Sequence, residues 1–201
     1  MLAPSAALAR LAASTPNRRR ILGIVGPPGA GKSTLARAVA DAFAGAVLVP
    51  MDGFHLAQSV LDDTGLADRK GAPETFDRAG YTALLTRLRA QRPENGPIYA
   101  PEFRRTIEEP VAGAIEVRPD CPLVVTEGNY LLLWPEVRPL LDETWWVDLD
   151  PQERRARLTA RHAAHGKTHE QAAAWTHGPD ERNARLVAPG RTAADVIVRN
   201  D

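Results

Sequence analysis

Cysteine is almost absent from this chain of 201 residues, in which Cys121 is the single thiol. One cysteine excludes an internal disulfide and is typical of proteins in a reducing compartment, so we expect a cytoplasmic protein. Long apolar runs are missing too, because no stretch approaches the roughly 18 residues that a membrane-spanning helix needs. We therefore expect no membrane partner.

An excess of charge of either sign is also lacking, since 25 basic residues balance 25 acidic ones. A formal charge of zero provides no global field for gripping nucleic acid, although a local basic patch stays possible, and we expect no nucleic-acid partner. Lysine is scarce among the basic residues and occurs only as Lys32, Lys70 and Lys167. Each lysine therefore suggests a local need for a compact ammonium, with chance as the alternative for Lys70 and Lys167.

The first 20 residues contain no acid and four arginines. Three of the arginines follow the apolar part, whereas a secretory signal carries its charge before that part. The composition also has some likeness to an organellar transit peptide. We favour a surface helix and a linker within residues 1–20, with Leu2, Leu8 and Leu11 packed against the domain.

Short apolar runs alternate with helical segments along most of the chain. The expected strands are Ile21–Val25, Val47–Val49, Leu123–Thr126, Thr144–Leu149 and Val196–Val198. The expected helices are Lys32–Phe43, Tyr81–Arg92, Tyr130–Leu141, Pro151–His165 and His169–Val187, with capping patterns at Asp150 and Thr168. Nearly continuous apolar strands separated by helices predict an α/β fold, a doubly wound parallel five-stranded sheet with helices on both faces.

Residues 65–119 break this alternation, being rich in proline and glycine, with short β-prone pieces at Ile98–Tyr99 and Ile115–Val117. We interpret them as a substrate-binding insertion that carries a helix and a small hairpin. The insertion is expected to attach to the main sheet, so that residues 1–201 form a single domain.

The stretch "GIVGPPGAGKST" contains Gly26-x-x-x-x-Gly31-Lys32-Ser33 between a predicted strand and a predicted helix. In that setting, backbone N–H groups and the helix N-terminus wrap phosphates, while Lys32 reaches the β- and γ-phosphates and the Ser33 hydroxyl binds Mg²⁺. The pattern predicts a P-loop NTPase fold. The expected nucleotide-binding residues of the loop are Gly26, Pro27, Pro28, Gly29, Ala30, Gly31, Lys32, Ser33 and Thr34.

A phosphate loop alone does not separate kinases from GTPases, motors or transporter ATPases. The chain contains no [NT]-K-x-D motif for reading guanine and no LSGGQ-like signature. The two Asp-x-x-Gly patterns, at Asp62–Gly65 and Asp77–Gly80, lie in loop-like sequence rather than after a main strand. These observations disfavour a switch GTPase.

Two acids follow predicted strands. Asp52 comes after the second strand, at the edge where ligands bind in doubly wound sheets, and could accept the proton of an attacking hydroxyl. A helix N-cap before Phe54–Leu61 explains Asp52 equally well. Glu127 ends the third strand, where a Mg²⁺ partner of Ser33 belongs; Asp148 and Asp150 compete for that role, but Asp150 already has a capping function.

After the phosphate loop, the motifs "MDGFH", "RKGAPETFD", "TEGNYLLL" and "RRARLTARH" follow in that order. In this combination the chain resembles the phosphoribulokinase, uridine kinase and bacterial pantothenate kinase family of P-loop kinases, over roughly Ile21 to Ala188. "MDGFH" with "RKGAPETFD" looks most like pantothenate kinases. The chain is shorter than those enzymes, however, and "EGNYLLL" resembles small bacterial kinases, some of them called nucleoside or fructose kinases.

The resemblance implies ATP and Mg²⁺ as cofactors and assigns roles to matching residues. It implies that Asp52 is the catalytic base and also touches the metal or its waters, with Ser33 and Glu127 on magnesium. Arg157 and Arg161 match lid arginines within a lid at residues 154–178, and Lys167 stands where a further lid cation is often arginine. Lys32, Asp52 and Arg161 would then be the catalytic residues, Arg161 by neutralising charge on the transferred group.

The acceptor pocket is expected to combine Asp52 and Glu127 with residues of the insertion and its surroundings, namely His55, Arg69, Lys70, Tyr99, Phe103 and Arg105. A solvated charged loop explains Arg69 or Lys70 alone equally well, and core packing explains Tyr99 and Phe103.

The resulting hypothesis is an ATP-dependent kinase that transfers the γ-phosphoryl group to a hydroxyl of a small pantothenate-, nucleoside- or sugar-like metabolite, with a homodimer as the candidate assembly. The alternatives are a nucleotide-binding regulatory or chaperone-like NTPase without a small acceptor, and a degenerate kinase kept as a binding module.

Overall fold

The computed structural model describes residues 1–13 and 18–200, and the central part of the predicted N-terminal linker lies outside them. Its main sheet has the order β2-β5-β1-β6-β7, and every neighbouring pair runs parallel. The strands are β1 (Arg20–Val25), β2 (Val47–Leu48), β5 (Leu123–Gly128), β6 (Glu143–Asp148) and β7 (Val196–Arg199). The predicted parallel five-stranded α/β sheet is confirmed.

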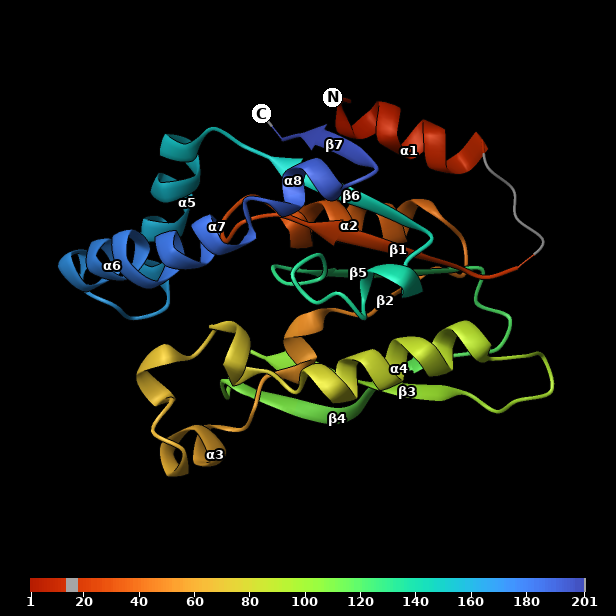
Figure 1. The fold of residues 1–201 in the computed structure, drawn as a ribbon, viewed down its shortest axis with the longest axis horizontal. Helices are drawn as coiled ribbons and strands as arrows, with labels where there is room; N and C mark the ends of the chain where they lie inside the picture. Colours follow the sequence, from red (N-terminus) through yellow and green to blue (C-terminus); the bar gives the residue numbers. More distant parts are fainter. Residues whose placement is uncertain (14–17, 201) are drawn as a thin grey trace.

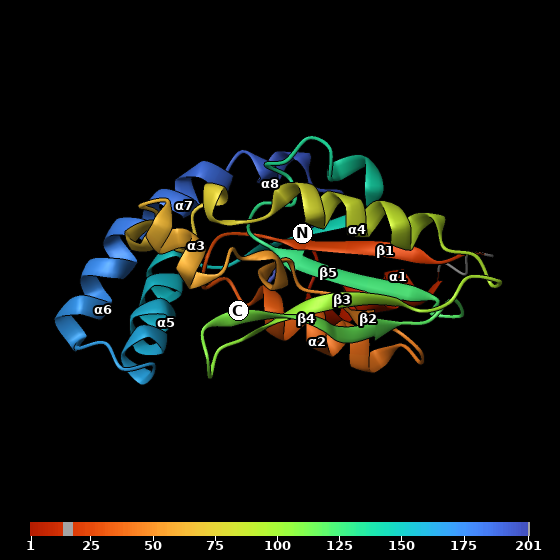
Figure 2. The ribbon, with the colours of Figure 1, turned by 90° about the horizontal axis from the view of Figure 1, so that it is seen from below.

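Helices cover both faces of this sheet (Figures 1 and 2). The helices of the described residues are α1 (Pro4–Ala13), α2 (Lys32–Ala42), α3 (Gln58–Asp63), α4 (Arg78–Ala90), α5 (Pro151–Ala164), α6 (His169–Trp175), α7 (Glu181–Val187) and α8 (Gly190–Ala193), of which α3 and α6 lie away from the main sheet. Figure 2 shows α2 and α4 on opposite sides of β1 and β5. Figure 1 shows α5, α6 and α7 together at one end of the molecule.

Alternate side chains of β1 enter two separate cores. Ile21 and Val25 belong to the core that contains α4 and buried side chains of residues 130–141. Leu22 and Ile24 belong to the core that contains α1 and α2. Because successive strand residues point to opposite faces, a strand apolar at every position serves both cores.

The predicted helix over Tyr130–Leu141 is wrong. Residues 129–137 form a series of turns that ends in a short 3₁₀ helix, Arg138–Leu140. Pro135 and Pro139 remove two amide donors from the middle of the segment, which disfavours a regular helix. Its apolar side chains are nevertheless buried in the core with α4, and this burial explains the apolar pattern.

The predicted helix over His169–Val187 begins and ends at those residues but is not α-helical throughout. Between α6 and α7 lies a π-helical turn, Thr176–Asp180, with Pro179 inside it. Proline has no N–H to donate to the preceding turn, and a π turn accommodates the missing bond. The capping residues are as predicted: Asp150 accepts hydrogen bonds from the amides of Gln152 and Glu153, and Thr168 forms a complete capping box.

The hairpin consists of β3 (Ile98–Arg104) and β4 (Glu109–Val117), which form an antiparallel sheet of their own. Both strands are longer than the β-prone pieces of the sequence suggested. The paired register shifts between Ala100 and Glu102. Ile98, Ala100 and Val117 are buried in the core with α4, so the hairpin packs on the same body as the main sheet.

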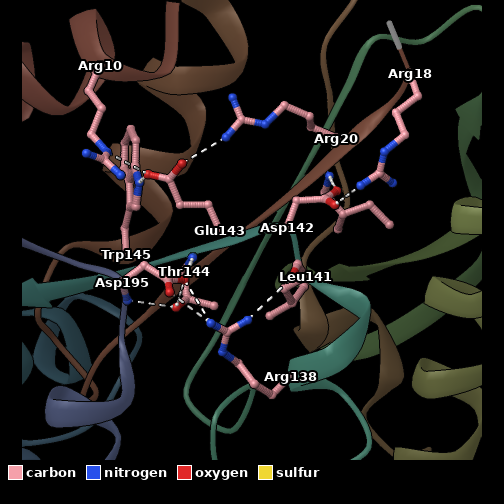
Figure 3. Close-up of polar contacts among 11 residues, drawn as sticks. Arg10, Arg18, Arg20, Arg138, Leu141, Asp142, Glu143, Thr144, Trp145 and Asp195 are labelled. Atoms are coloured by element: carbon pink, nitrogen blue, oxygen red, sulfur yellow. Dashed lines mark hydrogen bonds and ion pairs between the residues drawn. The ribbon is translucent and has the colours of Figure 1, made fainter. Parts of the chain in front are cut away.

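The N-terminal segment runs from the edge of β7, where Leu2 bridges Val198, toward the start of β6, where Arg10 binds Glu143. Leu11 is buried, and Leu2 and Leu8 pack against the core with α2, as predicted. The first residue of β6, Glu143, accepts hydrogen bonds from Arg10, Arg20 and the indole of Trp145 (Figure 3). In the same view, Arg138 joins Asp195 to the Leu141 carbonyl. This polar network therefore stabilises the edge opposite the carboxyl ends of the strands.

Across the described parts of the chain, no helix combines the length and the apolar character needed to cross a bilayer.

Candidate active site

The phosphate loop joins the end of β1 to the start of α2. Gly31 is the N-cap residue of α2 and has a left-handed φ of 93°, and a Cβ there would lie 2.2 Å from Nδ2 of Asn200. Gly29 has a φ of 80°, and a Cβ would lie 2.6 Å from Cγ of Leu158. Both positions therefore require glycine, and the free amides at the start of α2 are available to a phosphate.

Lys32 is buried at the first position of α2, with 8% of its surface exposed. Its Nζ donates a hydrogen bond to the Pro27 carbonyl over 3.0 Å. Burial lowers the pKa of Lys32 to about 8, although the charges of Glu127 and Asp52 oppose that shift. The ammonium is thus held inside the cleft at a cost in desolvation, as expected for a group that serves a bound anion.

Ser33 and Glu127 meet across the first turn of α2. The Ser33 hydroxyl donates to Oε1 of Glu127 over 2.9 Å, and Glu127 is 6% exposed. Burial raises the pKa of Glu127, and the nearby Asp52 charge raises it further. A hydroxyl and two carboxylates beside a phosphate site are hard oxygen donors that fit Mg²⁺, which usually keeps waters and binds only one or two carboxylates.

The competing acids lie elsewhere. Asp148 forms an ion pair with Arg191 over 3.0 Å, and Asp150 caps α5. Among the described residues that line the cleft, neither acid occurs.

Asp52 lies in a 3₁₀ turn, Met51–Phe54, that directly follows β2. The interpretation of Asp52 as a helix N-cap is wrong, because the following helix, α3, begins at Gln58 with Ala57 as its cap. The Asp52 side chain is 36% exposed and forms a loose ion pair with Arg105 over 3.8 Å. Asp52 is therefore free to meet a ligand in the cleft.

A cleft of about 530 Å³ opens at this edge of the sheet. Many of the sequence-predicted residues line it, namely Pro28, Gly29, Lys32, Ser33, Asp52, His55, Lys70, Phe103, Arg105, Glu127, Arg161 and Lys167. Gly26, Pro27, Ala30, Gly31 and Thr34 belong to the loop or to the first turn of α2 without lining it. Arg69, Tyr99 and Arg157 do not line the cleft, although Nη1 of Arg157 lies 3.9 Å from the position that a Cβ at Gly31 of the phosphate loop would take.

Each residue outside the cleft has another environment. Arg69 forms an ion pair with Glu74, and Arg157 with Glu153. Tyr99 is 54% exposed on β3.

The side of the cleft opposite the phosphate loop has an aromatic wall. The His55 ring lies between the rings of Phe76 and Phe103. Its centroid is 4.0 Å from the Phe76 centroid and 4.7 Å from the Phe103 centroid. Its Nδ1–H donates to the Asp52 backbone carbonyl over 2.8 Å. Burial lowers the pKa of His55, partly offset by the Asp52 charge. Burial thus favours the neutral form of the His55 ring, and this hydrogen bond places the proton of that form on Nδ1.

Helix α5 and the turn after it contribute two cations to the cleft and one buried arginine that binds the phosphate loop. Arg161 lines the cleft from α5, and burial lowers its pKa. Lys167 Nζ lies 4.6 Å from the centroid of the Trp175 ring. Arg154 is 4% exposed, donates to the Pro28 carbonyl of the phosphate loop over 3.2 Å and pairs with Glu181.

Sequence reasoning missed several residues of the cleft. Trp175 lines it. His162 and Asp180 line it as a hydrogen-bonded pair at 2.7 Å. Asn183 lines it and donates to the Gly71 carbonyl over 3.3 Å. His162 ends the motif "RRARLTARH", but no local pattern marks Trp175, Asp180 or Asn183, because these residues converge only when α6, the π turn and α7 fold over the cleft.

Comparisons with known proteins agree on the family. A family model described as "Phosphoribulokinase / Uridine kinase family" matches residues 21–200. An uncharacterized Escherichia coli K12 protein, YggC, is 36% identical over 201 residues, covering 95% of this chain and 82% of that protein. The ATP-dependent kinase-like protein notR' of Aspergillus versicolor is 34% identical over 159 residues, covering 75% and 88% of the two chains.

One solved structure is similar over almost its whole length. It comes from Silicibacter sp. TM1040 and is provisionally named a fructose transport system kinase. The two chains are 35% identical, with a TM-score of 0.85 and coverage of 98% of this chain and 99% of that one.

Proposed function

Because the chain belongs to the phosphoribulokinase / uridine kinase family, we propose that it is an ATP-dependent kinase that phosphorylates a hydroxyl of a small metabolite. The observation that carries this proposal is the meeting of Lys32, Ser33, Glu127 and Asp52 in one cleft, with Ser33 hydrogen-bonded to Glu127. Lys32, Ser33 and Glu127 are suited to binding the phosphates of ATP and Mg²⁺. Asp52 is suited to binding the hydroxyl of the acceptor.

The phosphate loop binds the triphosphate of ATP. The α2 amides and the Lys32 ammonium contact the β- and γ-phosphates, which restores to Lys32 the favourable interactions that burial removed. Ser33, Glu127 and Asp52 would hold Mg²⁺ or its waters, and a bound Mg²⁺ would neutralise part of the phosphate charge. Pantothenate-, nucleoside- and sugar-like alcohols are all candidate acceptors.

Asp52 orients the acceptor hydroxyl and takes its proton. As the hydroxyl oxygen bonds to the γ-phosphorus, the bond from that phosphorus to the β–γ bridging oxygen breaks and ADP leaves. Arg161, facing the cleft from α5, stabilises negative charge on the transferred group. Because phosphoryl transfer has a loose transition state, positioning and charge contribute more than the base does.

The test measures ADP formation with Mg²⁺-ATP against a panel of alcohols, in wild type and in Asp52→Asn. We expect one class of acceptor to stimulate ADP formation sharply, and the variant to bind ATP normally while losing turnover by about 10²–10⁴-fold. Asp63→Asn is the matched control, because Asp63 is exposed on α3 and away from the cleft. Hydrolysis of ATP that no acceptor stimulates would instead indicate a nucleotide-dependent regulator.

A further inference from the structure

Lys70 points a preorganised ammonium at the acceptor side of the cleft. Its Nζ donates to the Gln58 side-chain oxygen over 3.0 Å and to the Glu108 backbone carbonyl over 2.8 Å. It also lies 5.6 Å from the centroid of the Phe103 ring. An ammonium has three donors, so one N–H remains for a ligand after these two hydrogen bonds.

Among the described residues, Lys70 has no direct ion pair: the Glu109 carboxylate accepts hydrogen bonds from the Gln58 backbone N–H rather than from Lys70. Within residues 1–13 and 18–200, no carboxylate oxygen lies within ion-pair distance of Lys70 Nζ. Arg105, which lines the same side, pairs only loosely with Asp52, at 3.8 Å. In the part of the chain that the structure describes, two cations therefore border the acceptor side, Lys70 without a direct carboxylate partner and Arg105 with only a loose one.

The backbone beside Lys70 is fixed from two other elements. The Gly71 carbonyl accepts hydrogen bonds from the Tyr130 hydroxyl over 2.5 Å and from Asn183 over 3.3 Å. Gln58, which holds Lys70, is itself held by Asp62 over 2.9 Å. Such support is expected where a side chain must stay in place for a ligand, because ordering it on binding would cost affinity.

We propose that the acceptor is a small hydroxylated anion whose carboxylate or phosphate binds between Lys70 and Arg105 while its hydroxyl lies at Asp52. This inference rests on the proposed kinase function and narrows its substrate class. Neutral nucleosides and free sugars would leave the two cations facing the ligand without a counter-charge.

The experiment compares acceptors that differ in one anionic group. The pairs are glycerate with glycerol, pantothenate with panthenol, and fructose 6-phosphate with fructose, and uridine is added as a neutral nucleoside. We expect kcat/KM to be at least about 10-fold higher for the anionic member of the pair that the enzyme accepts. Comparing the carboxylate acceptors, glycerate and pantothenate, with the phosphate acceptor, fructose 6-phosphate, then shows which anionic group the site binds.

Two variants test the residues, each beside a neighbour that does not line the cleft. Lys70→Met is compared with Arg69→Met, because Arg69 is paired with Glu74. Arg105→Gln is compared with Arg104→Gln, because Arg104 lies 3.6 Å from Glu102. Lys70→Met and Arg105→Gln should each raise KM for the anionic acceptor by roughly 10- to 100-fold and leave KM for ATP unchanged. The two controls should keep the wild-type preference.

A binding measurement makes the test independent of turnover. With a non-hydrolysable ATP analogue and Mg²⁺ present, the preferred anion should raise the melting temperature of wild type and of Arg69→Met, but not of Lys70→Met. Equal or better use of the neutral member, or an unchanged preference in Lys70→Met, would overturn this inference and leave the kinase function standing. Absence of both binding and stimulated turnover across the panel would overturn the two together.

Discussion

The Ser33 hydroxyl donates a hydrogen bond to Oε1 of Glu127, and the two oxygens are 2.9 Å apart. Ser33 lies in the first turn of α2, and Glu127 is the next-to-last residue of β5. The contact therefore joins the phosphate loop to the tip of a neighbouring strand. It also holds two candidate oxygen ligands for Mg²⁺ in place at a buried site, where a carboxylate without a partner would cost free energy of folding.

Glu127→Gln should separate metal dependence from folding. The amide can still accept the Ser33 hydrogen bond, but it removes the negative charge that attracts Mg²⁺. We expect the Mg²⁺ concentration for half-maximal turnover to rise roughly 10- to 100-fold, without loss of stability in metal-free buffer. Magnesium titrations and thermal unfolding measure the two effects, with Glu94→Gln as control, because Glu94 is exposed and does not line the cleft. An unchanged magnesium requirement would remove Glu127 from the metal site.

Lys32→Met should stabilise the ligand-free protein while abolishing ATP binding. The folded-state pKa of about 8 lies below the ordinary 10.5, so burying the ammonium destabilises the fold fully below about pH 8. That cost fades as pH rises toward 10.5. We expect the free energy of unfolding to rise by roughly 1–3 kcal/mol at pH 7. The loss of the hydrogen bond to the Pro27 carbonyl offsets part of the relief from desolvation. Urea unfolding at pH 7 and pH 10 is the measurement, and a gain that persists undiminished at pH 10 would contradict this explanation.

The nucleotide end of the site could be predicted from the sequence because its residues follow strand ends. In a parallel sheet all carboxyl ends share one edge, so the positions of Asp52, Lys32 and Glu127 after their strands are enough to predict that they meet. Their separation along the chain does not matter once the strands are identified. The candidate metal ligands follow from the same rule.

The acceptor side could not be predicted as well, because small register changes decide which side chain faces the cleft. Tyr99 and Phe103 are four residues apart and would share a face in a regular strand. The register shift between Ala100 and Glu102 interrupts that alternation, so Phe103 lines the cleft while Tyr99 is exposed. Likewise, Arg69 and Lys70 are adjacent cations in one loop, and only the scarcity of lysine in the chain favours Lys70.

Gly29→Ala and Gly166→Ala should separate steric collision from backbone strain. Both glycines have positive φ, 80° and 92°, which costs a residue with a Cβ about 1–2 kcal/mol. A Cβ at Gly166 meets nothing within 4 Å, whereas one at Gly29 lies 2.6 Å from Leu158 and 3.0 Å from the Arg154 carbonyl. We expect Gly29→Ala to lose more stability and to weaken ATP binding, while Gly166→Ala loses only the smaller amount. Equal losses in urea unfolding would show that the loop yields to the added methyl.

Arg154→Gln should show that the phosphate loop depends on α5. The guanidinium is 4% exposed and bonds both the Pro28 carbonyl and Glu181, so its removal leaves a carboxylate without its main partner. We expect a loss of roughly 3 kcal/mol in the free energy of unfolding, together with a higher KM for ATP because Pro28 loses its support. Arg155→Gln is the matched control, because Arg155 is 30% exposed and reaches the same Glu181 over 3.9 Å. It should cost less than about 1 kcal/mol and leave KM for ATP unchanged.

If both variants lose the same stability with normal KM for ATP, Arg154 stabilises only the packing of α5 on α7, and its hydrogen bond to Pro28 does not shape the nucleotide site.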